Sequence, residues 1–159
     1  MVEAVDNKQP AVEDKQVWIA DDLQVIRFKI GKALKAEGYT VREFKNADEI
    51  ITAIEGIGEN PKNIAIVTDN QMPNHDCSPR EKNGIEVLKA ANGKKIPVLM
   101  ISASKIDKQM EEVKSAGTTA NGFFDKSNND YIPDLISKVK ELIGQAASPT
   151  QQPQAVRAL

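Results

Sequence analysis

The stretch Ile64-Ala65-Ile66-Val67-Thr68-Asp69-Asn70-Gln71-Met72-Pro73 joins a continuous apolar run to an acid and then to a proline. Residues 17–20 and 98–101 form similar runs, and residues 39–44 and 122–124 form two more that are shorter or mixed with polar residues. Three of the five runs are apolar throughout, as strands are when helices cover both faces of a parallel sheet. We therefore predict five strands.

Helical patterns fill the intervals between these runs. Leu23, Ile26, Ile30 and Leu34 repeat at helical spacing, and Gly38 follows as a C-cap. A second helix is predicted by Asn46, as N-cap, before the apolar residues Ile50, Ile51 and Ile54. Three more helices are predicted by periodic segments at 84–91, 105–116 and 129–143. The order βαβαβαβαβα with right-handed crossovers predicts an α/β fold, a doubly wound five-stranded parallel sheet.

Length and composition limit the classes of protein. A chain of 159 residues, 40% hydrophobic and 28% charged, fits one globular domain. We place the folded domain at 15–144 and predict disorder in the polar segments 1–14 and 145–159, the latter as a tail or linker. The net charge of -2 argues against direct nucleic acid binding. One cysteine, no secretion signal and no apolar stretch long enough to span a membrane lead us to expect a cytoplasmic protein.

Chemically useful side chains stand directly after four of the predicted strands. Asp21 and Asp22 follow the first, Asp69 the third, Ser102 the fourth and Lys126 the fifth. Each residue alone is more often a cap, a turn former or a solvated charge. Because parallel strands end at one edge of a sheet, where ligands of such folds bind, their coincidence predicts a functional site there.

Three carboxylates at one edge repel one another, by about 4 kcal/mol for each unit pair at 4 Å and an effective dielectric constant near 20. Either some are protonated or a cation neutralises them. Oxygen ligands without histidine or cysteine favour a hard ion, and Mg²⁺ is the natural candidate. A carboxylate beside Mg²⁺ and an ammonium group is well placed to receive a phosphoryl group, because both cations offset the transferred charge.

The pattern resembles the receiver (phosphoacceptor) domain of bacterial two-component response regulators, which has a flavodoxin-like (βα)5 fold. The resemblance rests on these stretches: Val17 to Asp22, Ile66 to Pro73 with its Asp-x-x-Met-Pro motif and Gly84 later, Ile96 to Ala103, and Phe123 to Lys126. It covers residues 16–143, essentially the whole predicted domain.

The resemblance implies a role for each matching residue. Asp69 would be the phosphoacceptor, and Asp22, Asp69 and the backbone carbonyl of Gln71 would bind Mg²⁺, which Asp21 would reach mostly through water. Lys126 would pair with the carboxylate and then with the phosphoryl oxygens. The donor would be a partner histidine kinase, a histidine phosphotransfer protein or, slowly, a small molecule such as acetyl phosphate. Such a chain is not a turnover enzyme, although it catalyses its own phosphorylation and dephosphorylation.

Two further positions would carry the conformational response. Ser102 would be the hydroxyl that moves to the phosphoryl group, and Phe123 the aromatic residue that turns inward with it. The response would control a downstream effector protein or relay the phosphoryl group. The resemblance leaves open whether the receiver acts alone or is linked through its tail to an effector domain, and it leaves the oligomeric state undetermined.

Two features depart from the family pattern. Ser127 follows Lys126 where most receivers have a proline in a cis peptide bond, so the turn is expected to differ while Lys126 still reaches the site. The loop 74–83 is longer than usual and lies beside Asp69, so we consider a role in partner choice or access. Its consecutive residues His75, Asp76 and Cys77 cannot comfortably face one ion, so we do not expect a metal there.

Two apolar residues of the first predicted helix are expected to be exposed. Phe28 lies off the apolar stripe of the first helix, and Val25 lies near it. Scattered surface apolar residues are common, but the family often docks phosphotransfer partners near this helix, so we consider Phe28 and Val25 part of a partner surface. Trp18, in contrast, is expected to pack against the sheet.

Three other classes of function fit the sequence less well. A degenerate receiver would keep the fold as a phosphorylation-independent protein-binding module, which the complete set of site residues argues against. A phosphatase with an aspartate nucleophile of the haloacid dehalogenase type would need a second acid where Gln71 stands, and a nucleophile on the first strand. A flavin site is disfavoured because the acidic pair Asp21-Asp22 would repel a phosphate.

Overall fold

Strands and helices alternate along the chain in the predicted order. The computed structural model describes residues 14–58, 61–72, 83–127 and 130–145. Within these residues, five parallel strands form one sheet in the order β2-β1-β3-β4-β5. The strands are β1 (Gln16–Ala20), β2 (Thr40–Phe44), β3 (Ile64–Asp69), β4 (Val98–Ser102) and β5 (Gly122–Asp125). The predicted doubly wound α/β fold is confirmed.

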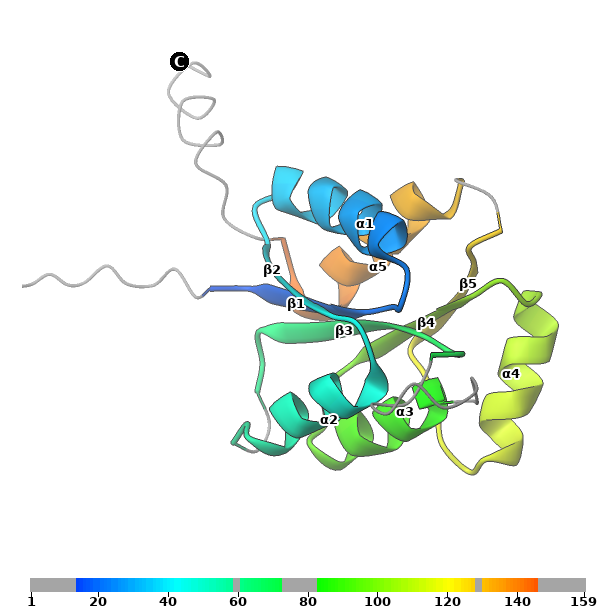
Figure 1. Cartoon of the computed structure of the whole chain (residues 1–159). Coiled ribbons are helices and arrows are strands. Elements are labelled where there is room, and N and C mark those ends of the chain that lie inside the picture. The colour runs from blue at the N-terminus through cyan, green and yellow to red at the C-terminus, as the bar shows by residue number, and fades with distance from the viewer. Residues whose placement is uncertain (1–13, 59–60, 73–82, 128–129, 146–159) are drawn as a thin grey trace, which may run out of the picture.

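Helices cover both faces of the sheet (Figure 1). They are α1 (Gln24–Ala36), α2 (Ala47–Glu55), α3 (Asn83–Gly93), α4 (Ile106–Ser115) and α5 (Tyr131–Ile143). One face carries α1 and α5, and the other carries α2, α3 and α4 (Figure 1). None of the helices in the described ranges has the length and apolar character needed to cross a membrane.

The side chains of successive strand residues alternate between two hydrophobic cores, as the pleat of a sheet requires. Every residue of β3 and β4 is buried, whereas β2 and β5 at the edges are partly exposed. The predicted sheet packing of Trp18 is confirmed, because it is 3% exposed and its ring lies 5.5 Å from that of Phe44. The Arg42 guanidinium covers the Trp18 ring at 4.6 Å.

Two of the predicted helix-end signals are confirmed, and one predicted helix residue is placed differently. Asn46 caps α2 as predicted, since its side-chain oxygen accepts a hydrogen bond from the Glu49 backbone nitrogen at 2.9 Å. Gly38 follows α1 with a φ of 94°, a conformation that favours glycine. The prediction that Leu23 belongs to the buried stripe is wrong. Leu23 precedes the first helical turn and is 41% exposed, while Ile30 and Leu34 are buried.

The order of the strands fixes where the site lies. The connections run in opposite directions from β1 and from β3, and ligands of such folds bind beyond the carboxyl ends of these two neighbouring strands. The predictions for segments 1–13 and 146–159, and for His75, Asp76 and Cys77 in the loop, lie outside the described residues.

Candidate functional site

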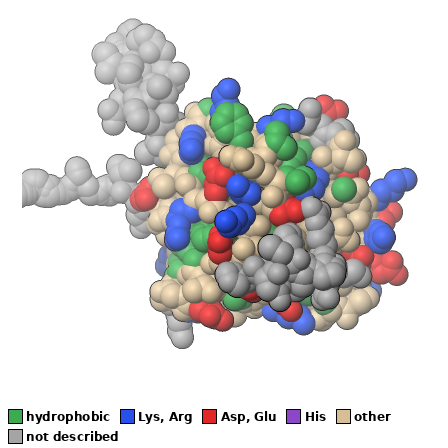
Figure 2. Space-filling view, in the orientation of Figure 1, with side chains coloured by type: hydrophobic (Ala, Val, Ile, Leu, Met, Phe, Trp, Pro, Cys, Tyr) green, Lys and Arg blue, Asp and Glu red, His purple; other side chains and the backbone are tan. Residues whose placement is uncertain are grey.

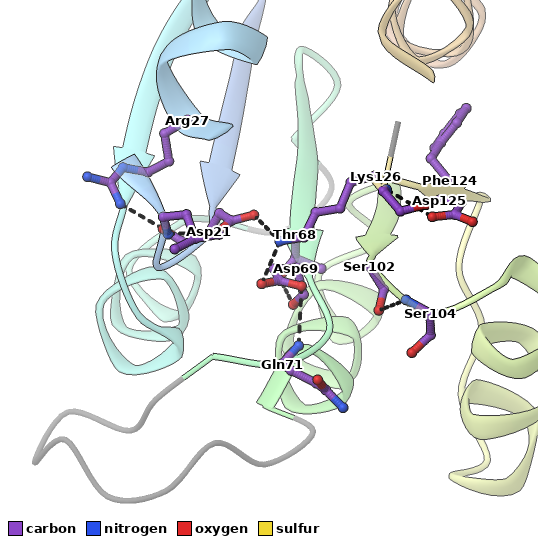
Figure 3. Close-up of polar contacts among 12 residues, drawn as sticks. Asp21, Arg27, Thr68, Asp69, Gln71, Ser102, Ser104, Phe124, Asp125 and Lys126 are labelled. Carbon is purple, nitrogen blue, oxygen red and sulfur yellow. Dashed lines mark hydrogen bonds and ion pairs between the residues drawn. The ribbon is translucent and has the colours of Figure 1, made fainter. Parts of the chain in front are cut away.

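The ammonium of Lys126 stands between two buried carboxylates at the strand ends (Figure 3). Its nitrogen lies 2.8 Å from Oδ2 of Asp21 and 3.0 Å from Oδ2 of Asp69. The exposed fractions of the three side chains are 9% for the lysine, 0% for Asp21 and 4% for Asp69. The ends of β1, β3 and β5 therefore bring these charges together as the sequence predicts.

Burial is the largest single influence on the pKa values of Asp21, Asp69 and Lys126. It raises the pKa of Asp69 to about 6, and the charge of Asp21 adds to the increase while Lys126 opposes it. Burial also raises the pKa of Asp21, again against the effect of Lys126. Burial alone would lower the pKa of Lys126, but its attraction to Asp69 and Asp21 outweighs burial and raises it. The lysine therefore stays charged, and the protonation of Asp69 is sensitive to whatever cation joins the cluster.

Three carboxylates lie close enough to share one metal ion. An oxygen atom from each of Asp21, Asp22 and Asp69 lies within 4.8 Å of the other two, and Asp22 is half-buried. With all three ionised, and one charge offset by Lys126, the cluster carries two negative charges. A divalent ion that prefers oxygen ligands fits this donor set. Gln71 follows β3, and its backbone nitrogen lies 3.4 Å from Oδ1 of Asp69. The role of its carbonyl as a metal ligand stays a prediction.

Asp21 has both a structural and a chemical part in the site. Its Oδ1 accepts a hydrogen bond from the Leu23 backbone nitrogen at 2.8 Å and so shapes the turn into α1. Arg27, which sequence reasoning missed, donates from Nη1 to the backbone carbonyl of Asp21 at 2.7 Å (Figure 3). It also donates from Nε to Oε1 of Glu43 at 3.1 Å. The arginine thereby ties the acidic turn to α1 and β2.

The two predicted switch residues lie on neighbouring strands. Ser102 is 2% exposed at the end of β4, and its hydroxyl oxygen accepts a hydrogen bond from the Ser104 backbone nitrogen at 3.1 Å. Its carbonyl accepts from the backbone nitrogen of Lys126 at 2.8 Å. Phe123 is half-buried in β5 and packs against the core beneath α2, α3 and α4. The roles of Ser102 and Phe123 in a conformational response stay predictions.

The turn after Lys126 forms without a cis bond. The Lys126–Ser127 peptide is trans, and the Ser127 backbone nitrogen donates to Oδ1 of Asp125 at 2.9 Å. The hydrogen bonds from Ser127 lower the pKa of the exposed Asp125. A local turn thus aims Lys126 at the site in place of the usual proline.

Two further residues lie close to the site: Gly84, which belongs to the stretches that carry the resemblance, and Tyr131, which the sequence did not indicate. A Cβ atom on Gly84 would lie 2.4 Å from the Asp69 carbonyl oxygen and 2.6 Å from the Asn70 Cα, so α3 approaches the end of β3 without room for a side chain. Tyr131 is 6% exposed at the start of α5. Burial, with the charges of Asp21 and Asp69, raises the pKa of Tyr131 to about 12. A tyrosine at a helix start gives no sequence signal of such a position.

The fold and the acidic site together define a doubly wound α/β protein with oxygen ligands and a lysine at its strand ends. The family model of the response regulator receiver domain matches residues 17–140. The chain therefore belongs to the receiver domain family of two-component response regulators.

Known relatives agree with this membership. Response regulator RR06 of Streptococcus pneumoniae serotype 2 is 30% identical in a match 134 residues long, and the match covers 80% of this chain and 52% of that protein. The chain thus spans about half the length of this curated relative.

Solved structures share the fold. A CheY-like response regulator receiver domain protein from Methanospirillum hungatei JF-1 has a TM-score of 0.62 and 25% identity, with 81% of this chain and 93% of that chain covered. The chemotaxis response regulator CheY4 of Vibrio cholerae has a TM-score of 0.62 and 22% identity, with 80% and 99% covered.

Proposed function

We propose that Asp69 is phosphorylated in a Mg²⁺-dependent reaction, and that the donor is a phosphohistidine on a partner histidine kinase or histidine phosphotransfer protein. The observation that carries this proposal is the ion pair between Lys126 and Asp69, at 3.0 Å, beside the Asp21 and Asp22 carboxylates. We propose a cytoplasmic location for the chain. Its single cysteine agrees with a reducing compartment.

The reaction transfers the phosphoryl group between two side chains. A carboxylate oxygen of Asp69 attacks phosphorus, and the bond between phosphorus and the histidine nitrogen breaks. The imidazole leaves with the electron pair and takes up a proton from solvent. Lys126 stays protonated and pairs with the transferred oxygens, which places positive charge where the transition state needs it. Mg²⁺ held by Asp21, Asp22, Asp69 and the Gln71 carbonyl would supply further positive charge against the phosphoryl oxygens.

The same residues catalyse the phosphorylation and dephosphorylation of Asp69 itself, so the chain is not a turnover enzyme. Acetyl phosphate replaces phosphohistidine as donor, with acetate as the leaving group, because the acceptor, the lysine and the metal ligands all belong to this chain. Hydrolysis of the acyl phosphate by water at the same site returns Asp69 to its carboxylate. We propose both reactions as slow events on one residue.

Phosphorylation is read out through Ser102 and Phe123. The Ser102 hydroxyl turns to donate to a phosphoryl oxygen, and Phe123 turns into the space that the serine leaves. A hydrogen bond to a charged group contributes about 1.5–3 kcal/mol. Moving an equilibrium from 1:99 to 99:1 requires about 5.5 kcal/mol. Ser102 alone therefore does not drive the change, and Lys126, the metal and the repacking of Phe123 contribute the rest. The changed surface controls an effector protein or passes the phosphoryl group on.

The phosphoryl donor docks on an apolar patch on α1, which we call the α1 patch and define as Val25 and Phe28. Their exposed fractions are 57% and 62%. The Lys32 ammonium lies 6.0 Å from the centre of the Phe28 ring, so the patch has a basic border. On the face drawn in Figure 2, acidic and basic side chains are interspersed, without an extended basic area of the kind that binds nucleic acid.

Intact-mass spectrometry tests the proposal. The chain is incubated with acetyl phosphate and Mg²⁺, beside Asp69→Asn and a sample containing EDTA. We expect a gain of one phosphoryl group in the wild type with Mg²⁺ and no gain in the other two. No gain in a folded wild type that also fails to bind Mg²⁺ would favour the alternative, a degenerate receiver that binds partners without phosphorylation.

A further inference from the structure

Helix α4 is held to the sheet by unusually little apolar packing. Its buried residues are Gln109 and Val113, so one apolar side chain is buried, whereas α5 buries Tyr131 and four aliphatic residues. It lies at the margin of its layer, beyond α3 (Figure 1). Because apolar burial is the main stabilising contribution for a surface helix, polar contacts must account for much of the docking of α4.

One of these contacts comes from Gln109, which is completely buried. Its Nε2 donates to the carbonyl of Ser104 at 2.9 Å and to the carbonyl of Phe124 at 3.0 Å. The Ser104 backbone nitrogen in turn donates to the Ser102 hydroxyl oxygen at 3.1 Å. The position of α4 is therefore linked to the serine of the site.

The other contact comes from Asn70, the residue directly after Asp69. Asn70 is completely buried, and its Nδ2 donates to Oε1 of Glu112 on α4 at 2.8 Å. Its backbone is fixed on both sides, because its nitrogen donates to the Ile101 carbonyl at 3.1 Å and its carbonyl accepts from Gly84 at 2.9 Å. The backbone of Asn70 is thus held between β4 and α3, and its side chain connects the residue after Asp69 to α4.

Both amides are only half satisfied. Oδ1 of Asn70 and Oε1 of Gln109 are buried and have no hydrogen-bond partner among the described residues. A buried polar atom without a partner costs free energy, so each amide loses part of the stabilisation that its hydrogen bonds at α4 provide.

We propose that Asn70 is a coupling residue that joins Asp69 to α4 through its hydrogen bond to Glu112. The bond is made while Asp69 carries no phosphoryl group, and it favours that state. Coupling between two sites is reciprocal, so a change at Glu112 alters binding of a phosphoryl group at Asp69, although Glu112 is not part of the site. The inference rests on the proposed function, because it concerns the ligand of the same carboxylate.

The test uses beryllofluoride with Mg²⁺ as a non-covalent analogue of the phosphoryl group, and its affinity is measured by titration followed in ¹H–¹⁵N spectra. Glu112→Ala removes the acceptor and is expected to raise the affinity about tenfold, a typical coupling between two sites. Glu112→Gln keeps an oxygen acceptor and is expected to restore wild-type affinity. Glu111→Ala removes the same charge from an exposed neighbour on α4 and is expected to change nothing.

A second variant approaches the bond from its other end. Asn70→Leu is expected to give the same increase as Glu112→Ala, and the double variant no further increase, because one bond can be lost only once. Hydrogen exchange of residues 106–115 is expected to rise in both single variants. The proposal is overturned if Glu112→Gln behaves like Glu112→Ala, if Glu111→Ala has the same effect, or if exchange rises while affinity stays unchanged.

Failure of the proposed function would look different from failure of the coupling. If the proposed function is wrong, the wild type binds no beryllofluoride. The coupling is then judged from the amide resonances of Asp69 and Gln71. They are expected to shift in Glu112→Ala and to stay in place in Glu111→Ala. Equal shifts in the two variants, or none in either, would overturn the coupling by itself.

Discussion

Lys126 reaches from the end of β5 to place its ammonium nitrogen 3.0 Å from Oδ2 of Asp69, with 9% of the lysine side chain exposed. The same ammonium contacts Asp21 at 2.8 Å. One buried cation therefore faces two buried carboxylates, and the cluster keeps a negative charge that a metal ion can offset. Electrostatics of this kind decide both the stability of the fold and its chemistry, and substitutions in the cluster test both.

Replacing the lysine leaves the two carboxylates facing each other. We expect Lys126→Met to lower the free energy of unfolding by about 3 kcal/mol at pH 8 without divalent metal, since breaking a buried ion pair strands a buried charge. The loss is expected to shrink at pH 5, where a carboxylate takes up a proton. Urea unfolding at the two pH values measures it. Lys138→Met serves as control, because it breaks an exposed pair with Glu141 that contributes at most about 1 kcal/mol. Equal losses in both variants would contradict the account.

The raised pKa of Asp69 predicts how stability depends on pH. The folded-state pKa of about 6 exceeds the ordinary value of 3.8, so the folded protein holds this proton more tightly than the unfolded chain. This group therefore lowers stability as pH rises from about 4 to about 6, by up to about 3 kcal/mol. We expect Asp69→Asn to be more stable than the wild type at pH 7.5 in EDTA, by an amount that vanishes near pH 4. The exposed substitution Asp107→Asn is the control. A difference that does not vary with pH would be evidence against the raised pKa.

The close approach of α3 to β3 predicts opposite effects of one substitution at two positions. In Gly84→Ala the added carbon would overlap the Asp69 carbonyl, so we expect a loss of about 1–3 kcal/mol and weaker phosphorylation by acetyl phosphate. In Gly93→Ala, at the end of the same helix, a Cβ meets nothing within 4 Å, so stability is unchanged or increased by up to about 1 kcal/mol. Thermal unfolding and mass spectrometry compare the two. A neutral Gly84→Ala would mean that the backbone at Asp69 yields easily.

Much of this site could be predicted from strand ends alone. The apolar runs before Asp69 and Ser102 mark buried parallel strands, and the residues at the carboxyl ends of parallel strands meet at one edge of the sheet. The depth of burial was not predictable, and it is burial that raises the pKa of Asp69. The assignment of Leu23 to the buried stripe is wrong, because helical spacing does not reveal where the first turn begins.

The contacts between side chains distant in sequence were the hardest to predict. Gln109 and Asn70 are polar residues in positions that a pattern of hydrophobicity assigns to the surface or to a turn, yet both are completely buried. The bond from Asn70 to Glu112 joins residues 42 positions apart. Such pairs depend on how α4 packs against the sheet, which the periodicity of a single helix does not specify.

The proposed switch separates chemistry from conformational response. We expect Ser102→Ala to accept a phosphoryl group from acetyl phosphate, since Asp69, Lys126 and the metal ligands remain. Its change in hydrogen exchange over Phe123 and α4 on phosphorylation is expected to be reduced, because the hydroxyl that moves to the phosphoryl group is absent. Ser115→Ala, an exposed change on α4, should respond as the wild type does. A full response from phosphorylated Ser102→Ala would refute the switch role.

The α1 patch predicts a defect limited to the protein donor. Phe28→Ser removes the most exposed apolar side chain of the patch, so transfer from a phosphohistidine protein should slow by at least about tenfold, as for an interface anchor. Phosphorylation by acetyl phosphate should not change, because Phe28 does not contact the acidic site. Met110→Ser, which alters a similarly accessible side chain on α4, is the control. Equal slowing with both donors would mean that Phe28→Ser disturbs the folded protein, and it would contradict a docking role of the patch.

The most direct test of the central claim is to locate the phosphoryl group. After reaction with acetyl phosphate and Mg²⁺, borohydride reduces an aspartyl phosphate to homoserine, and peptide mass spectrometry identifies the modified position. We predict homoserine at position 69 and nowhere else in the chain, with none formed in EDTA. Homoserine at Asp21 or Asp22, or none at position 69 in a protein that binds Mg²⁺, would contradict the assignment of Asp69 as the phosphoacceptor.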